Sequence, residues 1–205
     1  IKEINSSFKE NEYLLVSDKY EISETFVTDL TGPYQIKNII TVIASCMVWN
    51  KYYPDQLSPE VIKNGLRHVK NNTNMIGRWM IISDNPLVIA DAAHNIDGMK
   101  SIIQELSAIP AGKKHFVLGF VNDKDIGKIL SLFPSDAAYY WCMPDIPRGK
   151  NATETRAAGE KSGLSGKAHT SVKNPYLAAL SSADADDMIF VGGSSYVVGD
   201  FLATL

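Results

Sequence analysis

The stretch that most constrains the fold is Leu87-Val88-Ile89-Ala90-Asp91-Ala92-Ala93-His94-Asn95-Ile96-Asp97-Gly98. Its leading apolar residues predict a buried strand, which ends at the acid that follows them. Two small residues then precede His94 and Asn95, and a helix is expected from about Asp97. This strand–turn–helix pattern puts Asp91 at the carboxyl end of a strand, the edge where open α/β sheets bind their ligands.

The rest of the chain toward its carboxyl end alternates between strand and helix patterns. Strands are expected at 87–91, 115–121, 138–143, 169–172 and 188–191. Helices are expected at 97–108, 124–133, 152–162, 175–183 and 196–203. Alternation of this kind predicts an α/β fold with a mostly parallel, Rossmann-type sheet and helices on both faces.

The chain before residue 75 has a different organisation. Strands are expected at 13–16 and 25–30, and the apolar run 34–49 predicts a buried helix, whereas the polar opening 1–11 shows no beginning of a fold. A second helix should run from Ser58, as N-cap before a proline, to about residue 69. The polar segment 71–74 indicates a linker. These patterns divide the chain into two domains, 1–74 and 75–205.

Composition excludes several classes of protein. The chain has 205 residues and a net charge of −3, with no basic tract of the kind that binds nucleic acid. No apolar run approaches the length of a membrane span, and no signal segment opens the chain. Cys46 and Cys142 lie in apolar stretches and are expected to be small buried residues of a cytoplasmic protein. Because Ile1 is not a start methionine, we interpret the chain as part of a longer protein.

Three groups of residues could carry chemistry, and each has a structural alternative. Asp91 and His94 face a helix start that favours phosphate or carboxylate, but Asp91 and Asn95 could instead cap the turn and leave His94 exposed. Arg78 follows a glycine and could pair with phosphate, or it could be an ordinary surface arginine. The Asn38 amide could read the edge of a nucleotide base, or it could satisfy nearby backbone.

The order and spacing of these groups resemble the Mur ligase superfamily, and most closely the folylpolyglutamate synthase/dihydrofolate synthase family. The resemblance rests on Leu30-x-Gly32-x-Tyr34-Gln35-x-x-Asn38, on Gly77-Arg78 and on the Asp91-Ala-Ala-His94-Asn95 turn. In that turn Ala92 stands where the family has glycine and Ile96 where it has proline. Weaker matches follow at 117–119, at 123–125, at Pro147-Arg148 and at 192–196.

The resemblance implies an ATP-dependent amide ligase that adds L-glutamate to dihydropteroate, to folate polyglutamate or to both, through an acyl phosphate. It also implies that 1–74 is the tail of a central ATPase domain and 75–205 the amino-acid-binding domain. Asn38 would contact adenine and Arg78 the ATP phosphates. Asp91 would hold the ribose or orient its neighbours, and His94 would lie near the nucleotide and the incoming glutamate. Asp91 and His94 are thus the expected catalytic pair.

The resemblance further implies that Ser194 or Ser195 binds a glutamate carboxylate. Lys124 and Arg148 could do the same or could be solvated surface cations. The family's phosphate loop, Gly-x-x-Gly-Lys-Ser, has no counterpart in this chain. The residues that bind Mg²⁺ are also expected outside it, so we expect the chain alone to be inactive. The family is usually monomeric.

Three rival functions remain open. One is a Mur ligase that adds an amino acid to a peptidoglycan precursor, which shares the acid-x-x-His turn. Another is a noncatalytic α/β binding module in which Asp91 and His94 are turn residues. The last is a metal-dependent hydrolase with the same two residues as ligands, although only one histidine lies near the turn and no closed ligand set is visible.

Overall fold

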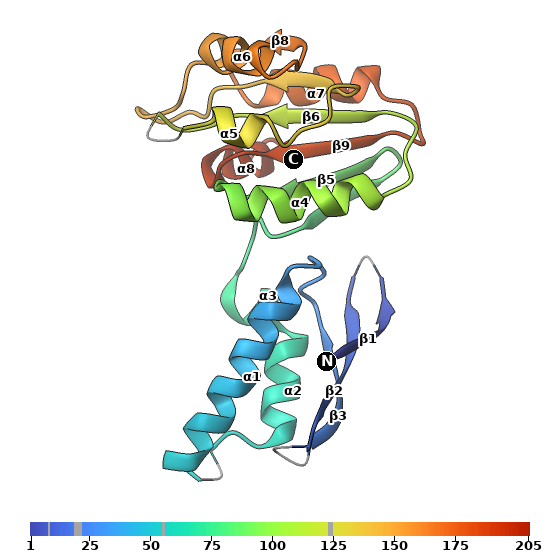
Figure 1. The fold of residues 1–205 in the computed structure, drawn as a ribbon, viewed down its shortest axis with the longest axis vertical. Helices are drawn as coiled ribbons and strands as arrows, with labels where there is room; N and C mark the ends of the chain where they lie inside the picture. The colour runs from blue at the N-terminus through green and yellow to red at the C-terminus, as the bar shows by residue number, and fades with distance from the viewer. Residues whose placement is uncertain (8, 19–21, 55, 123–124) are drawn as a thin grey trace. The chain divides into compact units, whose positions relative to one another are not determined.

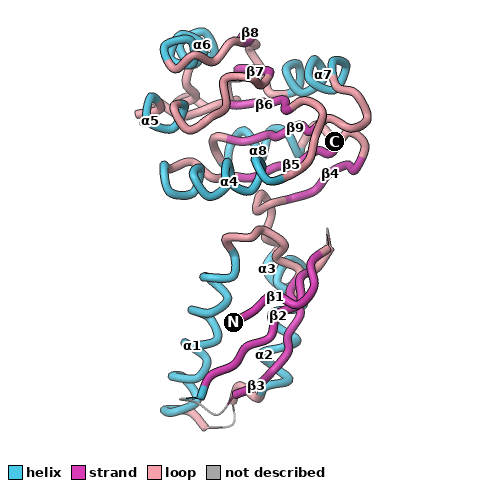
Figure 2. The backbone as a smooth tube through the Cα atoms, turned by 45° about the vertical axis from the view of Figure 1, so that its right-hand side comes forward, coloured by secondary structure: helices cyan, strands magenta, loops and turns pink. Residues whose placement is uncertain are grey.

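The computed structural model describes residues 1–7, 9–18, 22–54, 56–122 and 125–205. The chain divides into two units, Ile1–Ile76 and Gly77–Leu205. The division falls close to the boundary expected between residues 74 and 75. Figures 1 and 2 show the helices and strands of each unit.

The first unit combines an antiparallel sheet with helices. Its strands lie in the order β1-β2-β3 and comprise β1 (Lys2–Ser6), β2 (Asn11–Ser17) and β3 (Ile22–Thr28). Tyr13 of β2 lies opposite Phe26 of β3, and their rings stack with centroids 5.6 Å apart. Ile39 and Ile43 of the following helix join this pair in one apolar cluster. The predicted strands at 13–16 and 25–30 are therefore present, although β3 ends at Thr28.

Strand β1 corrects the expectation that residues 1–11 show no beginning of a fold. All five of its residues are exposed, so it has no buried face that a hydrophobic pattern could reveal. It is held instead by backbone pairing with β2, in a register that runs from Lys2 opposite Leu14 to Ser6 opposite Asn11. Such an edge strand depends on its neighbour rather than on its own side chains.

The helices of this unit are α1 (Gln35–Tyr52), α2 (Pro59–Arg67) and α3 (Val69–Thr73). The prediction of a buried helix is wrong in one respect, because α1 buries only one face while Val48 and Trp49 are exposed. The start of α2 is confirmed: the Ser58 hydroxyl accepts a hydrogen bond from the Val61 amide at 3.3 Å. Most of the predicted linker 71–74 belongs to α3, which ends at Asn74 in the left-handed conformation.

The second unit contains a six-stranded sheet in the order β4-β5-β9-β6-β7-β8, with β4 antiparallel to β5 and every other pair parallel. In Figures 1 and 2, β5, β9 and β6 lie side by side in the middle of the sheet. The mostly parallel α/β fold is thus confirmed. The strands are β4 (Met80–Asp84), β5 (Leu87–Asp91), β6 (Lys114–Leu118), β7 (Ala138–Trp141), β8 (Gly166–Ala168) and β9 (Met188–Gly192).

Helices cover both faces of this sheet because its side chains alternate between the two sides. On one face, Val88 and Val191 pack in a cluster with residues of α7 and α8. On the other face, the Trp141 ring lies against Gly159 of α6, and Phe116 lines a cavity together with Leu106 of α4. The helices are α4 (Ile96–Ala108), α5 (Gly127–Leu130), α6 (Ala152–Lys161), α7 (Lys173–Ser182) and α8 (Ser195–Leu202).

Two strands of the second unit differ from the sequence prediction. The prediction of a strand at 169–172 is wrong. The edge strand beside β7 is β8, which ends at Ala168, before that segment. A side chain at Gly166 would lie within 2.2 Å of the Tyr139 carbonyl oxygen, so the close pairing of β8 with β7 requires glycine there. Strand β4 is not predicted, although its Met80 and Ile82 pack against the core. The helix expected at 124–133 is reduced to the single turn α5, and Lys124 lies outside the described residues.

Candidate functional site

The carboxyl ends of three parallel strands meet at one edge of the second unit. Asp91 of β5 and Leu118 of β6 both lie in register with Gly192 of β9. Gly119 donates a backbone hydrogen bond to Gly192 at 3.2 Å, and Gly193 has a φ of +98°. A Cβ on Gly193 would lie 2.5 Å from the Gly119 carbonyl oxygen. Both the positive φ of Gly193 and its close approach to the Gly119 carbonyl therefore require glycine at this position.

Asp91 is the buried acid of this edge, with 1% of its surface exposed. Its Oδ1 accepts a hydrogen bond from the Ala93 amide at 2.8 Å, and its Oδ2 accepts one from the Trp79 amide at 2.7 Å. Such bonds compensate the loss of water around a buried carboxylate. Asp91 thus joins the turn after β5 to the segment that precedes β4.

Arg78 lies in that preceding segment, between two residues with positive φ. Gly77 has a φ of +72° and Trp79 a φ of +46°. The Gly77 carbonyl accepts a hydrogen bond from the Ala92 amide at 2.9 Å. Arg78 is half-buried, and among the described residues nothing hydrogen-bonds or ion-pairs with its guanidinium. The structure therefore holds the backbone of Arg78 beside the Asp91 turn and leaves its charge available to a ligand.

His94 is half-buried in the same turn, with its Nδ1 3.1 Å from the Ala92 carbonyl oxygen. Because a carbonyl only accepts hydrogen bonds, this contact places a proton on Nδ1. In the neutral ring Nε2 is then the unprotonated nitrogen, which can accept a proton.

Asn95, the next residue, caps helix α4. Its Oδ1 accepts a hydrogen bond from the Gly98 amide at 2.8 Å. Asn95 therefore has the capping role that the sequence offered as the structural alternative. Asp91 also binds backbone amides, but His94 is not a fully exposed turn residue.

The start of α8 lies at the same edge, just after β9. Ser194 is 3% exposed, and its hydroxyl caps the helix by accepting from the Val197 amide at 3.1 Å. Ser195, the first helical residue, is exposed. The first turn of α8 carries no acid, whereas Asp97 lies in the first turn of α4. An anion is therefore better accommodated at the start of α8 than at the start of α4.

Arg148 lies next to this helix start. Its Nη2 donates a hydrogen bond to the Tyr196 hydroxyl at 2.6 Å, and its Cζ lies 5.2 Å from the centre of the Tyr196 ring. The sequence indicates Arg148 as a carboxylate partner or a surface cation, and the structure places it beside α8. The other candidate cation, Lys124, lies outside the described residues.

Asn38 belongs to the first unit, in the first turns of α1. The residue is exposed, and its Nδ2 donates a hydrogen bond to the Oε1 of the buried Gln35 at 2.8 Å. This contact orients the amide. The second unit alone thus brings together Arg78, Asp91 and His94, with Ser194 and Ser195 at the same sheet edge.

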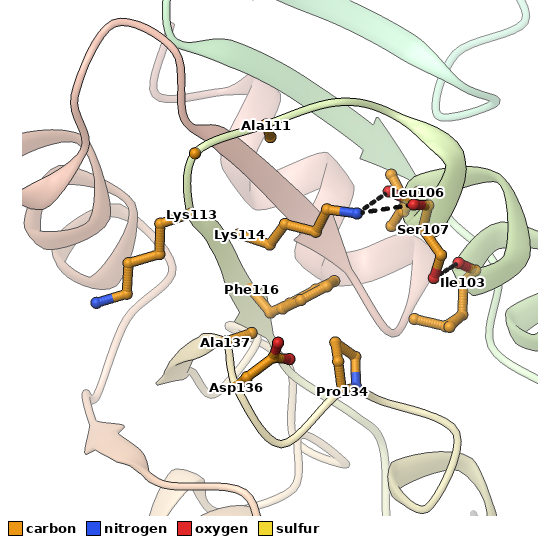
Figure 3. Close-up of a pocket in the computed structure, with 11 residues that line it drawn as sticks. Ile103, Leu106, Ser107, Ala111, Lys113, Lys114, Phe116, Pro134, Asp136 and Ala137 are labelled. Carbon is orange, nitrogen blue, oxygen red and sulfur yellow. Dashed lines mark hydrogen bonds between the residues drawn. The ribbon is translucent and has the colours of Figure 1, made fainter.

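A cavity of about 320 Å³ lies away from these residues, at the opposite end of the strands. Figure 3 shows Lys114, at the start of β6, donating to the carbonyl oxygens of Leu106 and Ser107 at the end of α4. The cavity contains none of the candidate residues. Within the described ranges, no cluster of three or more His, Cys, Asp or Glu side chains is arranged to hold a metal ion. Nor does any helix there have the length and apolarity needed to cross a membrane.

One residue of this edge escapes prediction from the sequence. Trp79 connects Arg78 to Asp91 through its amide, but a tryptophan gives no signal that its backbone is left-handed. Cys46 is a further correction: it is half-buried, whereas Cys142 is buried as expected, and both are free thiols.

Comparison with known proteins gives two kinds of match: a family model that matches most of the second unit, and individual proteins that match most of the chain. Residues 77–195, more than half of the chain, match the family described as Mur ligase, glutamate ligase domain. The dihydrofolate synthase/folylpolyglutamate synthase of Escherichia coli K12 is 32% identical over 148 residues, which cover 71% of this chain and 34% of that protein.

Solved structures agree with this relationship. E. coli FolC in complex with DHPP and ADP superimposes with a TM-score of 0.75 at 25% identity, over 96% of this chain and 45% of that one. A bifunctional folylpolyglutamate synthase/dihydrofolate synthase with Mn, AMPPNP and L-glutamate bound gives a TM-score of 0.65 at 27% identity, over 78% and 38%. The chain spans about a third of the length of the E. coli relative and less than half of these structures. By the match over residues 77–195, the chain belongs to the Mur ligase family and contains its glutamate ligase domain.

Proposed function

We propose that this chain is the carboxyl-terminal part of an ATP-dependent ligase that adds L-glutamate to dihydropteroate, to folate polyglutamate or to both. The reaction would proceed through an acyl phosphate on the accepting carboxyl group, which the glutamate amine then attacks. Residues 1–74 would be the tail of the central ATPase domain, and 75–205 the amino-acid-binding domain. The observation that carries this proposal is the turn after β5, where His94, with its Nδ1 on the Ala92 carbonyl, and the uncommitted guanidinium of Arg78 share one framework.

Arg78 and Asn38 are the proposed ATP contacts. The guanidinium of Arg78 matches phosphate oxygens in charge and in the geometry of its donors, and it stabilises the charge that develops during phosphoryl transfer. The Asn38 amide, already oriented by Gln35, offers donor and acceptor groups to adenine. Asp91 belongs to the same nucleotide site through its contact with the segment that carries Arg78.

His94 is the proposed catalytic group for the amine of glutamate. An amine attacks only after it has lost a proton, and Nε2 of the neutral His94 ring can accept that proton. Its Nδ1–H donates to the Ala92 carbonyl, which fixes both the tautomer and the ring orientation. Asp91 supports this role because it holds the Ala93 amide, directly before His94.

The carboxylates of glutamate are proposed to bind at the start of α8. Ser195 is exposed there, and the buried hydroxyl of Ser194 shapes the first turn. The positive end of the helix and the nearby Arg148 favour a negative charge.

ATP and Mg²⁺ are the expected cofactors, with the Mg²⁺ ligands outside this chain. This expectation follows from the sequence, which contains no counterpart of the family's phosphate loop Gly-x-x-Gly-Lys-Ser. When bound, Mg²⁺ supplies charge neutralisation for the transferring phosphate. We propose that the complete enzyme is a cytoplasmic monomer that does not bind nucleic acid, and that the 205-residue chain alone does not catalyse ligation.

The test is ATP-dependent incorporation of labelled L-glutamate by the complete protein that carries this chain. Dihydropteroate, a folate monoglutamate and a UDP-linked muramoyl peptide are offered separately as acceptors. We expect product with one or both pteroate-type acceptors and none with the UDP-linked peptide. Turnover of the peptide alone would assign the chain to the peptidoglycan ligases, and ligation by the isolated 205 residues would contradict the proposed division of labour.

A further inference from the structure

The backbone of Trp79 has a conformation that this residue type rarely adopts. Its φ is +46°, and the residue is 7% exposed. For an amino acid with a Cβ, the left-handed backbone conformation is unfavourable, and a bulky side chain at positive φ is a genuine outlier. The surrounding structure must therefore hold it there. The Trp79 amide donates to the buried Asp91 Oδ2 at 2.7 Å, the bond that fixes this orientation of the peptide.

A second hydrogen bond anchors the other side of Arg78. The Gly77 carbonyl accepts from the Ala92 amide at 2.9 Å, and Gly77 also has a positive φ, of +72°. A Cβ at Gly77 would lie 3.2 Å from Cγ1 of Val198, so the segment sits closely against α8. Residues 77–79, which we term the latch, are thus hydrogen-bonded at one end to Asp91, the last residue of β5, and at the other end to Ala92, the residue after it.

From this arrangement we infer that Asp91 acts on bound ATP through Arg78, with Trp79 as the positioning residue between them. The carboxylate holds the Trp79 amide, the left-handed Trp79 sets the direction in which the chain leaves Arg78, and the guanidinium is thereby directed at the phosphates. This inference rests on the proposed function for its ligand. The latch itself rests only on contacts within the second unit.

The charge and burial of Asp91 fit this role. Each of its oxygens accepts a backbone amide, one from Trp79 and one from Ala93. A carboxylate satisfies two N–H donors at once, whereas the amide of asparagine offers one acceptor oxygen and presents a donor to the second N–H. Asp91→Asn therefore keeps the side-chain shape and removes one of the two bonds.

A double-mutant cycle in the complete ligase tests the inference. Asp91→Asn, Arg78→Ala and the double variant are compared by their KM for ATP. The loss of one hydrogen bond to a charged group predicts that each single change raises this KM about tenfold. If Asp91 acts through Arg78, the double variant is no worse than Arg78→Ala alone. Effects that multiply to about a hundredfold would show that Asp91 contacts ATP independently, and would overturn the inference.

The exposed Asp84, on strand β4, supplies the matched control. Asp84→Asn makes the same chemical change outside the latch and should leave the KM for ATP unchanged. The kcat of the single latch variants should fall less than their kcat/KM, since the affected contact is made to bound ATP. A purely structural role of Asp91 would instead lower the amount of active enzyme without changing KM.

A second pair of variants keeps the test decisive if Asp91→Asn fails to fold. Trp79→Gly and Trp79→Ala remove the same ring, but glycine adopts positive φ freely and alanine does not. We expect the KM for ATP to be higher in Trp79→Ala than in Trp79→Gly. The reverse order would overturn the positioning role of the Trp79 backbone.

The latch can be measured apart from catalysis, in the 205-residue chain. Amide hydrogen exchange at Trp79 should be at least about tenfold faster in Asp91→Ala than in the wild-type chain, because Asp91→Ala removes the oxygen that accepts the hydrogen bond of this amide. An unchanged rate would disprove the latch. If the latch is confirmed but the complete wild-type protein performs no ATP-dependent ligation, the proposed function is wrong. The latch contacts then stand, but the inferred effect of Asp91 on bound ATP is wrong as well.

Discussion

His115 and Asp187 form a buried pair between neighbouring strands, with Nε2 of the imidazole 3.1 Å from Oδ2 of the carboxylate. His115 lies on β6 and is fully buried, and its Nδ1 is 3.2 Å from the Tyr140 hydroxyl. Asp187 directly precedes β9 and accepts hydrogen bonds from the amides of Asp184 and Lys113. The pair fastens the amino ends of β6 and β9, opposite the candidate site.

This pair makes stability depend on pH. Hydrogen bonds, chiefly from the Asp184 backbone and also from His115, hold the pKa of Asp187 below its ordinary value of 3.8. A carboxyl whose pKa is lowered by folding stabilises the protein fully above 3.8, and this stabilisation is lost as the pH falls through the folded-state pKa. We expect the free energy of unfolding in urea to fall between about pH 4 and pH 2, and to fall less steeply in Asp187→Asn.

The matched control for that titration is Asp136→Asn, since Asp136 is exposed. The free energy of unfolding of Asp136→Asn should fall with pH as steeply as that of the wild-type chain. If Asp187→Asn and the wild-type chain lose stability in parallel from pH 5 to pH 2, Asp187 makes no contribution to acid sensitivity.

Two helical glycines of the second unit should respond to alanine in opposite directions. A Cβ on Gly159 would lie 2.5 Å from Cζ2 of the buried Trp141 ring, whereas nothing lies within 4 Å of a Cβ on Gly199. Gly159→Ala should therefore destabilise the chain by about 1–3 kcal/mol through overpacking. Gly199→Ala should stabilise it by about 0.5–1 kcal/mol, because alanine is the better helix former.

Thermal or urea unfolding of the two glycine variants measures these changes. The sign is the informative quantity, since both substitutions add the same methyl group to a helix. Equal stabilisation by both would mean that α6 does not lie against Trp141 as closely as the structure has it.

Adjacent serines at the start of α8 should separate stability from ligand binding. Ser194→Ala removes the N-cap of α8 and should cost about 1 kcal/mol of stability. Ser195→Ala removes an exposed hydroxyl and should leave stability within about 0.5 kcal/mol of the wild-type value. If Ser195 binds a glutamate carboxylate, the KM for glutamate of the complete ligase should rise roughly tenfold in Ser195→Ala.

That assignment requires an unfolding measurement on both variants together with glutamate kinetics. An unchanged KM for glutamate in a stably folded Ser195→Ala enzyme would remove Ser195 from the substrate site. A change in KM caused only by Ser194→Ala would assign the effect to the conformation of the helix start.

The sequence predicts the elements whose signals are local. The apolar run 87–91 and the Asn-capped helix after it appear as β5 and α4, because burial and capping act within the segment itself. Strands held mainly by their neighbours are not predicted: β1 is entirely exposed, and β8 forms at Gly166 because only glycine fits beside β7. In such strands the pairing partner, rather than the hydrophobic pattern, determines the structure.

The candidate site shows the same division. His94 and Asn95 can be singled out from the turn that contains them, and the N-cap role of Asn95 follows from its place before a helix. The contact between Trp79 and Asp91 cannot be predicted, because it depends on a positive φ in a residue type that rarely adopts one. Backbone strain of this kind is visible only in coordinates.

If the turn after β5 is catalytic, ligation should depend on His94. In the complete protein, glutamate ligation to a pteroate or folate acceptor is measured for wild-type and His94→Ala enzymes at saturating ATP and glutamate. With Nε2 as the proton acceptor, kcat should fall at least about 100-fold while the variant stays folded. A folded His94→Ala enzyme with wild-type kcat would show that His94 is not the proton acceptor and that the turn is only a structural feature.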